Sequence, residues 1–225
     1  MTSLNVEAFG GLFFLAVMLG VALFLPAKTF YYWEAWVYIA LFSIASAVIT
    51  IYLMKKDKAL LQRRVNAGPA GEKQRMQKII QSVAQVAFLA IFVVSAFDHR
   101  LKWSPVPVLG VIVGDLLVLT GFYIVFRVFK ENTFTSATIE VATEQKVIST
   151  GPYSLVRHPM YSGALLMLMA TPLALGSWWG MLAFIPIAVV ILWRSIDEEK
   201  FLKANLPGYK EYCSIVRYRL IPGIC

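Results

Sequence analysis

Long apolar stretches alternate with short polar segments along almost the whole chain. Four stretches are long enough to cross about 30 Å of hydrocarbon as helices, at residues 8–25, 33–54, 79–97 and 106–128. Two shorter ones, at about 160–175 and 178–193, are separated only by Gly176-Ser177, and so short a joint predicts an antiparallel helical hairpin. The pattern predicts an all-α polytopic transmembrane bundle of about five to six spans.

Proline residues interrupt both arms of the predicted hairpin. Pro172 lies in the first arm and Pro186 in the second, so we expect both helices to be kinked or partly unwound. Irregular backbone at membrane depth is tolerated where it lines a cavity. The hairpin is therefore a candidate cavity wall.

Composition supports a membrane protein. Hydrophobic residues make up 59% of the chain, charged residues only 15%, and the mean hydropathy is +0.68, whereas soluble domains carry about 25% charged residues. The first apolar stretch is interpreted as a retained span and not as a cleaved signal peptide. Glu7 is the only charge before it, and residues 25–28 make a poor cleavage site.

Lys and Arg residues are concentrated on one side of the predicted spans. Eight lie in 55–78, four in 127–157 and six from 194 onward, which leaves Lys28, Arg100 and Lys102 for the other side. By the positive-inside rule the three basic segments are cytoplasmic, and six spans place both termini there as well. Most of the net charge of +8 is thereby explained without nucleic acid, and membrane lipids with anionic head groups are expected partners.

Three isolated side chains are expected to have no catalytic role. Asp115 lies within the stretch 106–128, and we favour a structural role in which Arg100 or Lys102 neutralises it. Cys213 and Cys225 provide neither a disulfide framework nor a metal-ligand spacing, so they are expected to be free thiols.

The densest group of reactive side chains directly precedes the hairpin. The run GPYSLVRHPMYSG occupies residues 151–163 and contains Tyr153, Arg157, His158 and Tyr161. A belt of arginine and tyrosine at the membrane surface would explain such a run without any function. Polar groups at membrane depth are nevertheless costly, and they often mark functional sites.

A second polar cluster follows the hairpin. A helix through residues 194–202 would place Arg194, Asp197 and Glu198 on one face, because they are three and four positions apart, with Glu199 beside them. A solvated helix next to the membrane would account for acids followed by lysines. The adjacent carboxylates also suit hydrogen bonds to ribose hydroxyls or the balancing of a cationic ligand.

The order of these motifs resembles a known family. GPYxxVRHPxYxG, a hairpin of about thirty residues, RxxxEExxL and GYxxY follow one another between residues 151 and 212. This order is similar to that of the isoprenylcysteine carboxyl methyltransferase family, to which phospholipid and small-thiol methyltransferases are related. The resemblance covers about residues 132–225. Together with the apolar pattern, it divides the chain into four N-terminal spans in residues 1–130 and, in residues 131–225, a catalytic core of cytoplasmic loop, hairpin and amphipathic tail helix.

The resemblance implies an integral membrane enzyme that binds S-adenosylmethionine at the cytoplasmic side and takes a lipophilic substrate from the bilayer. The expected cofactor-binding residues are Tyr153, His158, Tyr161, Gly163, Glu198 and Glu199. Gly163 would permit close approach of the cofactor. The expected catalytic residues are Arg157, which would meet the cofactor carboxylate, and Arg194, which with Arg217 would orient an anionic acceptor. Tyr209 and Tyr212 are expected to pack the tail, and no metal is required.

Several functions stay open. The favoured acceptor is an isoprenylcysteine-like carboxylate, with a thiol or a phospholipid amine as alternatives. The segment RHPxY also resembles membrane sterol reductases that use NADPH. Gly163 is followed by Ala164, where those enzymes usually carry an acid, and this speaks against them. A non-catalytic membrane protein with the same fold is the third interpretation.

Overall fold

The computed structural model describes residues 3–65, 75–135 and 145–224, and most of them are helical. The elements are α1 (Ser3–Ala27), α2 (Trp33–Lys56), α3 (Lys58–Val65), α4 (Arg75–Leu101), α5 (Val108–Glu131), the 3-10 turn η1 (Gly151–Ser154), α6 (Pro159–Ala174), α7 (Trp179–Asn205) and α8 (Tyr209–Ile215). The all-α prediction is confirmed.

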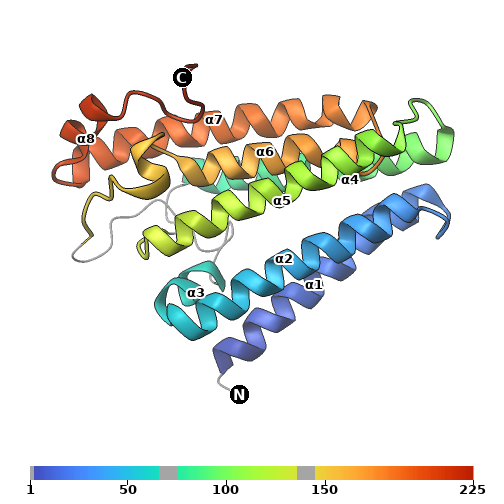
Figure 1. Cartoon of the computed structure of the whole chain (residues 1–225), viewed down its shortest axis with the longest axis horizontal. Coiled ribbons are helices and arrows are strands. Elements are labelled where there is room, and N and C mark those ends of the chain that lie inside the picture. The colour runs from blue at the N-terminus through green and yellow to red at the C-terminus, as the bar shows by residue number, and fades with distance from the viewer. Residues whose placement is uncertain (1–2, 66–74, 136–144, 225) are drawn as a thin grey trace.

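The six long helices form one closed bundle (Figure 1). Going around it, α1 packs on α2, α2 on α5, α5 on α6, α6 on α7, α7 on α4, and α4 again on α1. Large apolar side chains stay exposed on the outward faces, as lipid contact requires, among them Phe13, Phe14, Val86, Leu109 and Leu116. Five helices are long and apolar enough to span a membrane, and α6 is a shorter apolar helix. The protein is therefore an integral, multi-pass membrane protein.

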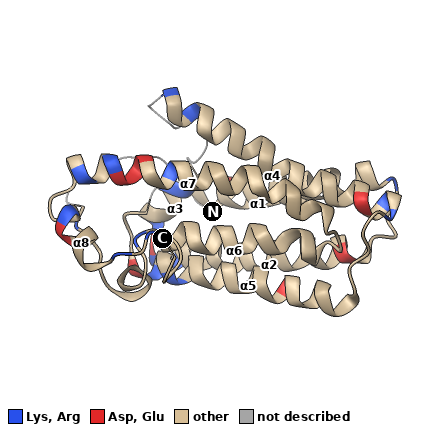
Figure 2. Cartoon of the chain, turned by 90° about the horizontal axis from the view of Figure 1, so that it is seen from above, with Lys and Arg blue, Asp and Glu red and all other residues tan. Residues whose placement is uncertain are grey.

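The two ends of the bundle differ in charge. One, which we name the basic end, holds α3, α8 and the last turns of α2, α5 and α7, which carry Lys and Arg. In Figure 2 the ribbon is blue at Lys and Arg positions along α8 and the C-terminal part of α7. The other, the hairpin end, holds the α6–α7 turn and the segments that follow α1 and α4. In α6 and α7 the helices continue through Pro172 and Pro186, so the expected unwinding does not occur.

Asp98 ties the segments of the hairpin end together. It is 2% exposed. Its carboxylate accepts hydrogen bonds from Ser177 Oγ at 2.5 Å, from the Ser104 backbone N–H at 2.8 Å and from the Ser104 hydroxyl. Next to it, Tyr32 Oη donates to the Leu175 carbonyl at 2.7 Å. The α6–α7 turn is therefore fixed to α4 and to the start of α2 by buried polar contacts.

Replacing Asp98 with alanine is expected to destabilise the protein by about 3 kcal/mol, because at least two buried donors lose their acceptor. Thermal unfolding in detergent measures the effect. Glu7→Gln, at an exposed position of α1, is the control and should leave the melting temperature unchanged. Equal melting temperatures of both variants would contradict the proposed contribution of Asp98.

Glycine residues let α5 and α6 approach closely. A Cβ atom at Gly114 would lie 2.4 Å from the backbone nitrogen of Ala174, and one at Gly121 would lie 2.7 Å from the carbonyl oxygen of Gly163. Directly after Gly114, the expected pairing of Asp115 with Arg100 or Lys102 is not formed among the described residues. Asp115 Oδ1 is buried and has no hydrogen-bond partner among the described residues.

Cys213 is a free thiol, as expected, and Cys225 lies outside the described residues.

Candidate functional site

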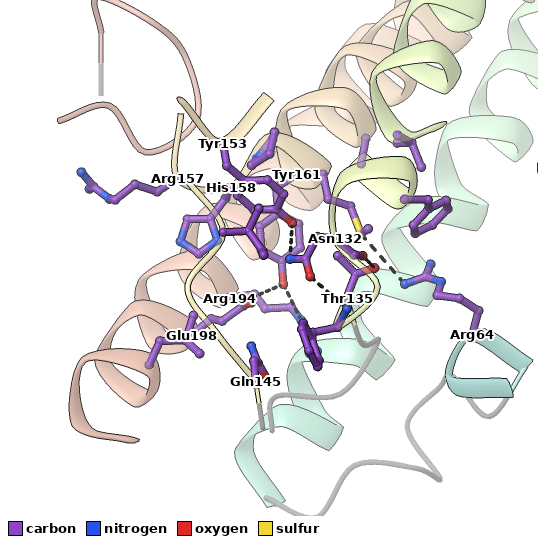
Figure 3. A pocket seen from close by; sticks show the side chains of 18 of the residues that line it. Arg64, Asn132, Thr135, Gln145, Tyr153, Arg157, His158, Tyr161, Arg194 and Glu198 are labelled. Carbon is purple, nitrogen blue, oxygen red and sulfur yellow. Dashed lines mark hydrogen bonds between the residues drawn. The ribbon is translucent and has the colours of Figure 1, made fainter. Parts of the chain in front are cut away.

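A cavity of about 560 Å³ opens at the basic end, between α2, α3, α5, the start of α6, the far part of α7 and α8. Its polar lining is shown in Figure 3. The polar and charged lining residues include Arg64, Gln81, Asn132, Gln145, Lys146, Tyr153, Arg157, His158, Tyr161, Arg194, Glu198 and Tyr209. Six of the eight residues predicted for the site therefore face one cavity. Gly163 and Glu199 are the other two, and neither lines it.

The two sequence motifs meet through Tyr161. Its hydroxyl donates a hydrogen bond to Glu198 Oε2 at 2.7 Å and accepts one from Arg194 Nε at 3.1 Å. Arg194 Nη1 donates to Gln77 Oε1 at 3.0 Å, and Gln77 Nε2 donates to Asp197 Oδ2 at 3.2 Å. A single network thus joins α6, α7 and α4 at the cavity wall. It fixes the direction of Glu198 and Arg194.

Glu199 lies behind the cavity wall and is 2% exposed. Its Oε1 accepts a hydrogen bond from Arg157 Nε at 2.6 Å, and its Oε2 accepts one from Arg219 Nη2 at 3.0 Å. His158 Nε2 and Lys203 Nζ each lie 3.5 Å from this carboxylate. A carboxylate surrounded by four basic groups is already satisfied by protein partners. In this structure Glu199 therefore holds the cavity-lining residues Arg157 and His158 in place.

The segment 216–220, which we name the tail strap, lies along the start of α6. The backbone N–H groups of Arg157 and His158 donate to the carbonyls of Tyr218 and Arg219, both at 2.9 Å. Arg157 Nη1 adds hydrogen bonds to two further carbonyls of the strap, at 2.9 and 2.6 Å. The strap and Glu199 together leave Arg157 few directions to move. Arg217, expected to help orient the acceptor, has an exposed side chain and does not line the cavity.

Gly163 serves the contact between helices in this structure. A Cβ atom there would lie 3.0 Å from the Gly121 carbonyl oxygen and 3.1 Å from the Ile124 side chain. The sequence pattern pointed correctly to a position that needs glycine. The close neighbour is α5, however, and not the cavity.

Tyr153 is fixed in the cavity wall from two sides. Asn132 Nδ2 donates a hydrogen bond to its hydroxyl at 3.0 Å, and Tyr212 Oη donates to its backbone carbonyl at 2.7 Å. Burial raises the pKa of Tyr153 well above its ordinary value, so the side chain stays a neutral phenol. As expected, Tyr209 and Tyr212 pack the tail, in a cluster with Leu202. Both also face the cavity, which the sequence did not indicate.

Several polar residues that line or support the cavity were not predicted as site residues, among them Gln77 and Arg64. Gln77 lies in the basic segment 55–78, which the sequence places between two spans, yet α4 begins at Arg75 and buries Gln77 to 1% exposure. Arg64 belongs to α3, within the same basic segment, where a charge pattern alone does not separate a solvated arginine from a buried one. Arg64 follows Leu60 and Leu61, both buried, by four and three positions, and this helical spacing was the available signal that it shares their face.

The path from α5 through η1 and α6 to the end of α7 supplies most of this site. Residues 109–207 match the phospholipid methyltransferase family. The match confirms the resemblance indicated by the motifs, because this family covers the isoprenylcysteine methyltransferase-like membrane proteins. It contains both motifs and ends before α8 and the tail strap. The family supports a membrane methyltransferase.

A second comparison points in a different direction. The chain is 32% identical over 128 aligned residues to the Delta(14)-sterol reductase TM7SF2 of Mus musculus. The aligned part covers 48% of this chain and 29% of the mouse protein. The chain thus spans less than a third of that relative. The phospholipid methyltransferase family match and the reductase similarity both leave the substrate open.

Proposed function

We propose that this chain is an S-adenosylmethionine-dependent methyltransferase that modifies a lipophilic acceptor taken from the bilayer. The observation that carries the proposal is the two-sided lining of the cavity. Its polar wall comes from the motifs at the start of α6 and in α7. Its apolar wall comes from Ile49, Leu53, Phe122, Val125, Phe129 and Met167. A soluble cofactor and an amphiphilic acceptor need these two environments side by side.

The residues present fit S-adenosylmethionine. Glu198 offers a carboxylate for an ammonium group or for ribose hydroxyls, and Tyr153, His158 and Tyr161 offer further polar contacts. Tyr209 Oη is buried and has no hydrogen-bond partner among the described residues, although such hydroxyls are nearly always paired in proteins. Burial raises the pKa of Tyr209, so it stays a neutral donor. A polar ligand in the cavity would supply the missing partner.

Methyl transfer from this cofactor depends mainly on how the acceptor atom is aligned with the methyl group. S-adenosylmethionine supplies an activated methyl group when bound. The protein then has to hold the acceptor atom in line with the methyl carbon and sulfur, and positioning of this kind can account for much of the acceleration. Tyr161 and the Arg194 that it contacts are suited to this task because their network fixes them. Water would be kept from the reacting atoms by the apolar wall.

The favoured acceptor is the carboxylate of an isoprenylcysteine-like lipid, which would be O-methylated. Arg194 supports an anionic acceptor because its guanidinium can bind a carboxylate in bidentate fashion. A thiol or a phospholipid amine is the alternative within the same family. By the positive-inside rule, the basic end and the cofactor site would face the cytoplasm.

An NADPH-dependent reductase is the second candidate. Its support is the similarity to the mouse Delta(14)-sterol reductase. The chain carries Ala164 after Gly163, and the matched family is one of methyltransferases. We therefore rank the reductase below the methyltransferase.

Thermal unfolding distinguishes the two candidates. Purified protein is expected to gain stability with S-adenosylhomocysteine, by about 2.7 kcal/mol at a hundredfold excess over the dissociation constant, and to show no gain with NADPH. A gain with NADPH alone would favour the reductase. A gain with neither would favour the non-catalytic interpretation. Transfer of a tritiated methyl group in membranes then compares a prenylcysteine analogue, thiols and phosphatidylethanolamine as acceptors.

A further inference from the structure

Arg64 is a partly buried cation with no anionic partner among the described residues. It lies on α3 and faces the cavity. Within the cavity it contacts a thioether and an aromatic ring. Nη1 lies 4.0 Å from the sulfur of Met160, and the guanidinium carbon lies 5.4 Å from the centre of the Phe129 ring. A ring face and a thioether orient a guanidinium, but they leave most of its charge and its donors uncompensated.

The surroundings of Arg64 are themselves positive. Of the described residues that line the cavity, Arg64, Lys146, Arg157, Arg194 and the imidazole of His158 are basic, and Glu198 is acidic. Burial lowers the pKa of Arg64 and, as a weaker effect, so does the charge of Arg194. Arginine stays protonated at neutral pH despite such shifts. Among the described lining residues, positive charge therefore exceeds negative charge even after Glu199 has neutralised Arg157.

Arg64 lies next to apolar residues of the cavity wall. Phe129, the ring beneath its guanidinium, also lines the cavity, together with Leu61 of the same helix α3 and Leu53 of α2. An acceptor whose chain lies along these residues would bring its head group to Arg64. An arginine beside an apolar wall, with no anionic partner among the described residues, is suited to a lipid with an anionic head.

We propose that Arg64 forms an anion-binding subsite for the head group of the acceptor lipid, a carboxylate or a phosphate attached to a hydrocarbon chain. The inference rests on the proposed function, in that it assigns part of the cavity to the acceptor. It adds a residue outside both motifs and outside the family match at 109–207.

The test uses the full-length protein in nanodiscs of phosphatidylcholine that contain a small fraction of oleate, phosphatidate or oleyl alcohol. Oleate and phosphatidate are expected to raise the melting temperature of the wild type above its value with oleyl alcohol. Arg64→Gln should bind the effective anion about tenfold less tightly, as expected for the loss of a charged hydrogen bond. A larger rise in melting temperature with oleate would indicate a carboxylate head group, and a larger rise with phosphatidate would indicate a phosphate head group.

Arg63→Gln is the matched control. Arg63 has the same charge, neighbours Arg64 on α3 and does not line the cavity, and it donates to the Thr133 carbonyl. It should keep the response to the anion. Equal responses of wild type and Arg64→Gln, or equal losses in both variants, would overturn the proposal. If anionic lipids were attracted only by the overall charge of the basic end, Arg63→Gln and Arg64→Gln would reduce the response to the anion equally.

Stability without added anion provides a second readout. Because Arg64 has no carboxylate partner, Arg64→Gln should be at least as stable as the wild type with oleyl alcohol. A marked loss of stability would assign Arg64 a structural role instead. S-adenosylhomocysteine is titrated in the same samples. If it fails to bind the wild type, the proposed function fails, while the anion response of Arg64 is still measured independently.

Discussion

Replacing Glu199 with glutamine is expected to weaken S-adenosylmethionine binding at least about tenfold, while the protein still inserts into membranes. Glu199 accepts hydrogen bonds from Arg157 and Arg219 and forms an ion pair with Lys203. Removing one side of a buried ion pair costs about 3–5 kcal/mol, since the remaining charges stay buried without compensation. Arg157 and the tail strap would then lose their fixed positions, and the cavity wall formed by His158 would move with them.

Isothermal calorimetry at a temperature well below unfolding measures this effect. His158→Ala should also weaken binding, because His158 lines the cavity directly. Glu211→Gln, which removes an exposed acid from α8, is the control and should bind as the wild type does. Unchanged binding in both Glu199→Gln and His158→Ala would remove these residues from the cofactor site.

A large effect on folding is also expected for Gly114→Val. The added Cβ would lie 2.4 Å from the backbone nitrogen of Ala174 and 2.8 Å from its Cα. Backbone atoms cannot turn away as a side chain does, so α5 and α6 would have to separate. Overpacking in a well-packed core costs about 1–3 kcal/mol, and a shift of two helices should reach the upper part of this range.

The yield of monodisperse protein and its melting temperature in detergent test this expectation. Gly20→Val is the matched control, because no atom lies within 4 Å of a Cβ at Gly20 and the helix α1 is also a span. The control should keep its yield. If Gly114→Val behaves like Gly20→Val, the close contact of α5 and α6 does not limit stability.

The sequence predicted the helices and the meeting of the two motifs because both depend on strong local signals. Apolar length indicated the spans. The short joint at Gly176-Ser177 indicated the hairpin, which brings Tyr161 and Glu198 within hydrogen-bonding distance. These features follow from hydropathy and from turn length.

The different roles of neighbouring residues could not be predicted from such local signals. Glu198 and Glu199 are adjacent and chemically alike, yet Glu198 faces the cavity and Glu199 binds the tail strap. The difference arises from their rotation on α7 relative to Arg157 and Arg219. Arg64 and Gln77 likewise become part of the site only through the way α3 and α4 pack, which is a property of the tertiary structure.

Helix α6 is short, and its length affects how deep in the membrane a lipid meets the site. With 16 residues the helix is about 24 Å long, several ångströms less than the hydrocarbon layer. Tyr161 in its first turn, and His158 just before it, would thus sit recessed below the level of the surrounding phosphates. A long-chain molecule could present its head there by sliding sideways, with its tail still dissolved among other tails. Exposure of each methylene to water, at about 0.8 kcal/mol, would then be avoided.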